Sequence, residues 1–262
     1  MLTPVSTSLC SERQRPAEHT ALANILVVYH SKRGTLRALA QAAADGARTA
    51  GATVRLCRIP GPDDLPVSKE FPATAAESEP TLADLIWADG IVWGTPTYYG
   101  NVSAPVKQFI DSTSGLWSLG LLADCVVSGL TSSTSVGGGQ ESTLLGLYRS
   151  MYHWGALVVS TDSSTEGWHE VGGNSYGLSV CASAGAIAAH EHEMAREVGA
   201  RVARFARRTH ALRDQRRGED CPVPQHNCRL PEAAGRPPSR LTVLVQDGPA
   251  RLDELAGAVA VG

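Results

Sequence analysis

The chain has 262 residues, of which 43% are hydrophobic, and its formal net charge is -3 at pH 7. Proteins that neutralise nucleic-acid phosphates need a basic surface, so this charge argues against a nucleic-acid partner. The hydrophobic content is enough for one substantial core, yet no apolar stretch approaches the ~20 residues that span a bilayer. The polar N-terminal stretch also lacks a signal-peptide core. These features predict a cytoplasmic protein without a membrane span.

The first predicted element is a buried strand, since apolar residues run from Ile25 to Tyr29. A short polar turn and an alanine-rich helix follow. At such a turn, backbone N–H groups without helical partners point together and the helix dipole favours an anion. Ser31 and Thr35 add hydroxyl groups, and Gly34 allows close approach of the backbone. The pattern predicts a phosphate site, although an ordinary strand-to-helix connection is the alternative.

The rest of the chain alternates between strands and helices. Further strands are predicted at residues 52–59, 91–94, 124–130 and 156–161. Helices are predicted at residues 81–90, 103–113, 143–155 and 190–208, the last with Met194, Val198, Val202 and Phe205 facing the core. Proline and small residues predict a long surface loop at residues 60–80. This order predicts a doubly wound, five-stranded parallel sheet of the α/β class with helices on both faces.

In such a sheet the ligand lies outside the carboxyl ends of the strands. Three polar or glycine-rich turns follow predicted strands at that edge, at residues 30–35, 95–101 and 131–142. We therefore expect the three turns to form one site.

No metal site is predicted. The six cysteines are scattered without a C-x-x-C pair, so reduced thiols are expected rather than a disulfide framework or a zinc site. The run His190 to Glu193 lacks the H-E-x-x-H spacing and is expected on a solvated helix face.

The two ends differ in composition from the middle of the chain. Residues 1–23 are expected to form a flexible extension, and residues 211–262 begin with an arginine- and proline-rich linker and continue as a tail of unknown role. One domain is therefore predicted at residues 24–210.

Five motifs, "GTPTYYGN", "FIDSTSGLW", "SSTSVGGGQE", "YHWG" and "GGNSYG", follow one another in this domain. In order and spacing the chain resembles WrbA-type NAD(P)H:quinone oxidoreductases. The resemblance implies a flavodoxin-like fold, FMN as cofactor, and NADPH or NADH as co-substrate. It further implies transfer of two electrons to a quinone-like acceptor by a ping-pong mechanism, and a homo-oligomer, either a dimer or a tetramer.

The resemblance also assigns site residues. Those implied to contact FMN are Ser31, Lys32, Arg33, Gly34, Thr35, Leu36, Thr97, Tyr98, Tyr99, Gly100, Ser133, Thr134, Ser135, Val136, Gly137, Gly138 and His153. The catalytic residues implied are His153, which would approach the flavin, and Trp117, which would wall the substrate pocket. In the family, these two residues come from neighbouring subunits.

The chain departs from the family pattern in two loops. Arg33, preceded by Lys32, replaces an aromatic residue, and its charge can pair with the FMN phosphate, pair with the extra phosphate of NADPH, or point to solvent. Ser135 and Val136 replace glycine and threonine, which predicts weaker FMN binding. The alternative functions are a flavodoxin-like electron carrier without a nicotinamide site and a non-catalytic binding protein on a degenerate scaffold.

Overall fold

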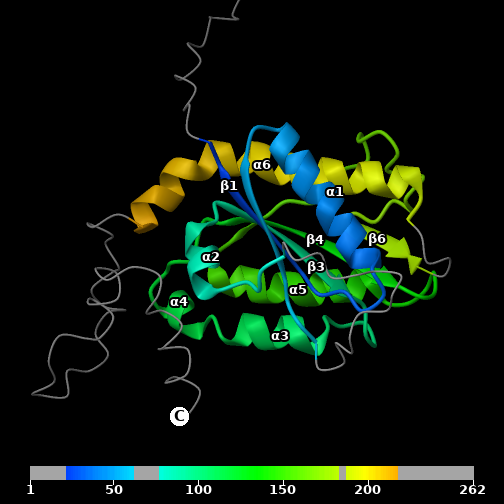
Figure 1. Ribbon diagram of the computed structural model, residues 1–262, viewed down its shortest axis with the longest axis horizontal. Coiled ribbons are helices and arrows are strands. Elements are labelled where there is room, and N and C mark those ends of the chain that lie inside the picture. The colour runs from blue at the N-terminus through cyan, green and yellow to red at the C-terminus, as the bar shows by residue number, and fades with distance from the viewer. Residues whose placement is uncertain (1–21, 62–76, 183–186, 218–262) are drawn as a thin grey trace, which may run out of the picture.

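Figure 1 shows the computed structural model, which describes residues 22–61, 77–182 and 187–217. Most of the predicted N-terminal extension and most of the predicted tail, residues 1–21 and 218–262, lie outside the described residues, as do residues 62–76 of the predicted surface loop. Among the helices of the described ranges, none is both long and apolar enough to cross a membrane.

The strands form one parallel sheet at the centre of the molecule. The described strands are β1 (Asn24–Tyr29), β2 (Thr53–Arg58), β3 (Gly90–Pro96), β4 (Val126–Ser133), β5 (Leu157–Val158) and β6 (Leu178–Cys181). Their order across the sheet is β2-β1-β3-β4-β5, and β6 also pairs with β4. All pairs are parallel. The predicted doubly wound parallel sheet of flavodoxin-like form is confirmed.

The fifth position of the sheet is shared by two short strands. β5 pairs through Leu157 with Val126 near the start of β4, and β6 pairs through Leu178 with Leu130 in its second half. The prediction of one strand at residues 156–161 was therefore too long, and β6 was not predicted. The residues between β5 and β6 leave the sheet and then return to it. Just before β6, the buried Tyr148 hydroxyl donates a hydrogen bond to the carbonyl oxygen of Tyr176.

Helices cover both faces of this sheet. The helices are α1 (Thr35–Thr49), α2 (Leu82–Trp87), α3 (Ala104–Asp111), α4 (Ser114–Ser118), α5 (Gln140–Trp154) and α6 (Ala189–Arg217). In Figure 1, α1 and α6 lie on one face and the other four helices on the opposite face. Each face has its own buried apolar cluster, as hydrophobic strands covered on both sides require.

The two helices of the first face pack at backbone distance. A Cβ atom at Gly46 of α1 would overlap the carbonyl oxygen of Arg196, and one at Gly199 of α6 would overlap that of Ala43. The glycines, together with alanines on both helices, let the axes approach closely. This contact fixes α1, and therefore its amino end, against the sheet.

Helix α6 differs from the prediction in two respects. It continues to Arg217, so the predicted boundary at residue 210 falls inside the helix. Phe205 was predicted to face the core and is 39% exposed. Its ring packs under the guanidinium of Arg201, 5.1 Å from the ring centroid. The buried positions of this turn are Val202, Ala203 and Ala206, so Phe205 lies beside the core-facing side of the helix.

Candidate functional site

Three loops follow neighbouring strands at the carboxyl edge of the sheet. They connect β1 to α1, β3 to α3, and β4 to α5, and the order β1-β3-β4 places them side by side. In Figure 1 this edge is where the arrow of β6 ends. The structure thus brings together the predicted site residues of all three turns, and leaves His153 and Trp117 elsewhere.

The first loop presents unfilled donors at the start of α1. Gly34 is the N-cap residue with φ 90°, no side chain caps the helix, and no acidic residue lies in its first turn. The Ser31 hydroxyl accepts a hydrogen bond from the Gly34 N–H at 3.1 Å, so Ser31 shapes the loop. Ser31, Thr35 and Leu36 are buried. The left-handed backbone at Gly34 aims the following N–H groups at the loop's open side, as an anion site requires.

Two residues that were not predicted as site residues, His30 and Arg58, support this loop. His30 is buried, and its Nδ1 atom lies 3.0 Å from the carbonyl oxygen of Ile59. The half-buried Arg58, at the end of β2, donates to the carbonyl oxygen of Ser31 at 3.5 Å. The pairing of Tyr29 with Arg58 explains this contact, since both strands end beside the loop. A predicted order of strands would have identified Arg58.

A carboxylate also braces the start of α1. Glu77 accepts from the Tyr29 hydroxyl at 2.6 Å and from the Arg37 side chain at 3.2 Å. The Glu77 side chain is 8% exposed. Burial and this hydrogen bond to a carboxylate raise the pKa of Tyr29, so its hydroxyl remains the donor. The contacts hold the first turn of α1 against β1.

The second loop exposes an aromatic ring. Tyr98 and Asn101 exchange backbone hydrogen bonds of 3.0 and 2.9 Å, which closes a tight turn. Between them Tyr99 has φ 52° and Gly100 has φ 72°. Tyr99 is fully exposed, with a relative accessibility of 101%. A bulky residue in the left-handed region is strained, and strain of this kind is concentrated at functional sites.

The third loop folds around one carbonyl group. The Ser135 carbonyl oxygen accepts from the Ser133 hydroxyl, from the Gly138 N–H at 3.2 Å and from the Gln140 side chain at 3.2 Å. Val136 is 87% exposed, and Thr134 and Gly137 are exposed as well. The loop is therefore internally braced, and its tip is open. Gln140 had not been identified from the sequence.

The second and third loops touch each other. A Cβ atom at Gly139 would lie 2.9 Å from the Cα atom of Gly100. Thr97 donates its N–H to the Ser132 carbonyl oxygen at 2.8 Å, and its hydroxyl lies 2.8 Å from that of Thr131. These contacts make the two loops a single surface beside the exposed Tyr99.

His153 and Trp117 lie together at the opposite edge of the sheet. Trp117 Nε1 donates to the His153 carbonyl oxygen at 2.7 Å, and both side chains are exposed. Helix α5 runs from the third loop to this edge over 15 residues, which corresponds to about 20 Å. Within one chain, then, these two residues do not meet the loops.

The same amino edge holds a buried network of charges. Arg213 is fully buried, and burial lowers its pKa. Its guanidinium donates to the carbonyl oxygens of Leu85, Ala88, Leu121 and Ala123. The buried Asp89 lies 2.8 Å from Arg217 and 3.1 Å from His210. These contacts tie the end of α6 to the loops that precede β3 and β4.

One group in the described ranges has the composition of a metal site. Asp89, His210 and Asp214 each offer one ligand atom, all within 4.8 Å of one another. Arg217 already neutralises Asp89 there, and His210 lies between the two carboxylates. A metal ion would have to displace Arg217 from Asp89, so we assign the group to ion pairing and hydrogen bonding.

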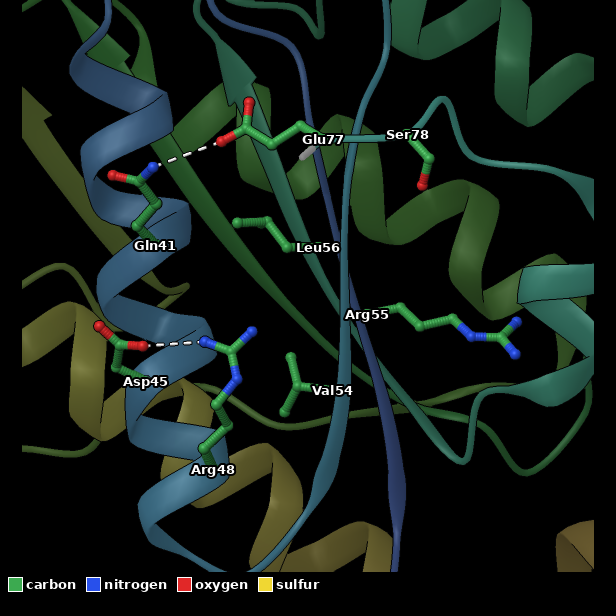
Figure 2. A pocket seen from close by; sticks show the side chains of 8 residues that line it. All are labelled: Gln41, Asp45, Arg48, Val54, Arg55, Leu56, Glu77 and Ser78. Carbon is green, nitrogen blue, oxygen red and sulfur yellow. Dashed lines mark hydrogen bonds and ion pairs between the residues drawn. The ribbon is translucent and has the colours of Figure 1, made fainter. Parts of the chain in front are cut away.

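A cavity of about 590 Å³ lies between α1 and the edge strand β2 (Figure 2), and none of its lining residues belongs to the three loops. Gln41 donates to Glu77 at 3.3 Å and Arg48 to Asp45 at 2.9 Å. Arg55 extends away from α1 in the figure, toward an ion pair on α2. Because these polar groups are paired with one another, the cavity does not define a ligand.

Comparisons with known proteins agree with this arrangement. The model of the family described as NADPH-dependent FMN reductase matches residues 23–170. NAD(P)H dehydrogenase (quinone) from Deinococcus radiodurans is 40% identical over 171 residues, which are 63% of this chain and 86% of that protein. The protein of the same name from Methylocella silvestris is 36% identical over 194 residues, 71% of this chain and 98% of that protein.

A solved structure gives the same assignment. The flavodoxin, WrbA-like protein from Agrobacterium tumefaciens is 31% identical, with a TM-score of 0.53 and coverage of 71% of this chain and 98% of that one. This match covers a larger share of the chain than the family model does. The chain belongs to the NADPH-dependent FMN reductase family, in which it resembles the WrbA-type NAD(P)H:quinone oxidoreductases.

Proposed function

We propose that this protein is an FMN-dependent oxidoreductase that transfers two electrons from NAD(P)H to a quinone. The observation that carries the proposal is the joining of three features at one edge of the sheet. These are an uncapped helix start for a phosphate, a braced glycine-containing loop, and the exposed ring of Tyr99. The names of the relatives, NAD(P)H dehydrogenase (quinone), support the same reaction.

The residues present fit FMN. The N–H groups that follow Gly34 would hold its phosphate, since no side chain or acidic group occupies the start of α1. The ring of Tyr99 would lie against the flavin, and the backbone of residues 133–138 would offer donors to its polar edge. The Ser135 carbonyl oxygen accepts from three donors of its own loop, the Gly138 N–H among them, so the other N–H groups of the loop would serve the cofactor.

When bound, FMN supplies the hydride chemistry, by accepting a hydride from NAD(P)H and passing two electrons to the acceptor. The chain's own contribution is to bind and orient. Its loops would hold the ring system, and the exposed Tyr99 and Val136 would exclude water around it. NAD(P)H and quinone would use the same open face of the flavin in turn, which would give ping-pong kinetics.

A second copy of the chain would complete this site. His153, Trp117 and Tyr152 form an exposed group at the amino edge, an unusual place for two large aromatic side chains. In a homo-oligomer, a dimer or a tetramer, this group would face the loops of a neighbour. His153 would then lie where it can stabilise charge on the quinone oxygen. A cytoplasmic location remains part of the proposal.

The test is a titration of the apoprotein with FMN, followed by anaerobic mixing of the loaded protein with NADPH and then with benzoquinone. The proposal predicts that bound flavin is bleached by NADPH and regains its colour with benzoquinone. If FMN binds and NADPH does not bleach it, the protein is an electron carrier rather than a reductase. If FMN does not bind, the loops serve another ligand.

A further inference from the structure

The phosphate loop carries exposed cationic side chains beside its backbone donors. Lys32 and Arg33 are both exposed at its tip. Arg58 reaches it from the end of β2 and contacts the Ser31 carbonyl oxygen. The dipole of α1 adds a further positive end at the same place. Cations from two different elements therefore surround one small loop.

The acidic groups described near the loop do not pair with Arg33. No acidic residue lies in the first turn of α1. Glu77 is turned toward Tyr29 and Arg37, with both carboxylate oxygens engaged. Within the described ranges, no residue forms a hydrogen bond or an ion pair with the Arg33 side chain. Arg33 is thus an exposed guanidinium held beside an anion site by its position in the loop.

The two nucleotides of the proposed reaction present different numbers of phosphates. A backbone cradle at the start of α1 suffices for the single phosphate of FMN, as it does at other helix starts. NADH adds a pyrophosphate, whereas NADPH adds a further phosphate monoester on its adenosine ribose. A guanidinium is well suited to that group because it donates two parallel hydrogen bonds to phosphate oxygens.

We propose that the Arg33 side chain recognises the 2′-phosphate of NADPH, so that the enzyme prefers NADPH to NADH. Arg58 acts as a positioning residue, because its contact with the Ser31 carbonyl oxygen orients the loop that carries Arg33. This inference rests on the proposed function and names the co-substrate of the same site. It assigns the FMN phosphate to the loop backbone and the Arg33 guanidinium to the second nucleotide.

The experiment uses the FMN-loaded full chain and two probes that cannot react, 2′,5′-ADP and 5′-AMP. They differ by the phosphate in question, so their affinities isolate it without turnover. We expect the wild type to bind 2′,5′-ADP more tightly than 5′-AMP at low salt. Arg33→Gln should weaken 2′,5′-ADP binding by about tenfold and leave 5′-AMP binding and the FMN dissociation constant within about twofold.

Arg48→Gln is the matched control for the loss of one positive charge. Arg48 is a half-exposed arginine of α1, paired with Asp45 and outside the three loops. Its variant should bind both probes as the wild type does. A similar loss in both variants would mean that overall charge, rather than Arg33, attracts the nucleotide, and would overturn the inference.

Two other outcomes also overturn it. Equal binding of the two probes by the wild type would show that the 2′-phosphate is not recognised. If Arg33→Gln raises the FMN dissociation constant about tenfold and leaves probe binding unchanged, Arg33 contacts the FMN phosphate instead. Failure of the proposed function has a different signature, which is a wild-type chain that does not bind FMN or whose flavin neither NADPH nor NADH bleaches.

Discussion

The two edges of the sheet differ in whether their backbone polar groups have partners within the protein. At the carboxyl edge, the backbone is bent through glycines, the helix start at Gly34 is uncapped, and Tyr99 stands in solvent. At the amino edge, the buried Arg213 donates hydrogen bonds to backbone carbonyls, and the buried Asp89 lies beside Arg217 and His210. Polar groups without protein partners lie at the edge where we propose that FMN binds, and polar groups with partners lie at the edge that stabilises the fold.

The largest effect should come from breaking the amino edge. Arg213→Ala would leave buried carbonyls of the α2 end and of the loop before β4 without donors. We expect a loss of about 3–5 kcal/mol in the free energy of unfolding, measured by urea denaturation. FMN affinity of the folded fraction should stay near the wild-type value.

Arg208→Ala is the control for this prediction, since Arg208 is exposed on the same helix. It should cost less than about 0.5 kcal/mol. Equal stability of Arg213→Ala and Arg208→Ala would show that the buried contacts do not stabilise the amino edge.

Trp117→Ala tests whether the amino edge also serves a neighbouring copy. An exposed tryptophan at the centre of an interface commonly contributes about 2 kcal/mol to association. The variant should therefore dissociate at higher protein concentrations in analytical ultracentrifugation, with unchanged FMN affinity and a lower kcat/KM for quinone. If the variant associates as strongly as the wild type, Trp117 does not contribute to the interface.

Gly34→Ala tests the backbone of the carboxyl edge. At φ 90° a Cβ atom is strained, so we expect a loss of about 1–2 kcal/mol of stability and an FMN dissociation constant raised about tenfold. Gly115→Ala is the control, because nothing lies within 4 Å of its added Cβ atom and its φ is not positive. If both variants bind FMN equally well, the left-handed loop is not needed for the phosphate.

Substitutions of Tyr99 distinguish the effect of its backbone strain on stability from the effect of its ring on FMN binding. Tyr99→Gly should relieve the left-handed backbone, which raises stability by about 0.5–1 kcal/mol, and should weaken FMN binding by about tenfold because the ring is lost. Tyr99→Phe keeps the ring and should bind FMN like the wild type. A variant Tyr99→Gly that binds FMN normally would show that the flavin does not stack on this side chain.

A last effect appears only at alkaline pH. Burial raises the pKa values of Tyr29 and Tyr148 above the ordinary value of 10.0, so both stay protonated in the folded chain while the unfolded chain loses its protons. Their contribution to stability is therefore complete below about pH 10 and is lost as the pH rises further. Each can contribute about 1.4 kcal/mol per pH unit to the slope.

Urea denaturation between pH 9 and pH 11.5 measures this slope. Tyr29→Phe should make it shallower, since one of the two groups is removed. An unchanged slope would show that Tyr29 ionises in the folded chain as it does in the unfolded one.

The sequence predicted the carboxyl edge better than the amino edge. Apolar runs followed by glycine-containing turns are local patterns, so the strands ending at Tyr29 and Pro96 and the loops after them were found. The chirality and order of a doubly wound sheet then brought the three loops together. The neighbouring of β1 and β2 likewise places Arg58 beside the first loop, but only the structure shows that its side chain reaches the Ser31 carbonyl oxygen.

What was missed depends on long-range contacts. The run of arginines after residue 210 has the composition of a linker, yet Arg213 is buried because carbonyl groups from two distant loops surround it. Phe205 follows the apolar period of α6, but the buried positions of its turn are Val202, Ala203 and Ala206. β6 is short, and its pairing with β4 is fixed by tertiary contacts rather than by its own pattern.

Hydrogen exchange with and without FMN is the most direct test of where the cofactor lies. FMN should slow exchange of backbone amides in residues 31–36, 97–101 and 133–139, and should leave residues 85–90 and 121–125 unchanged. Protection confined to the amino edge, or uniform protection without a maximum at the three loops, would contradict the assignment of the carboxyl edge as the flavin site.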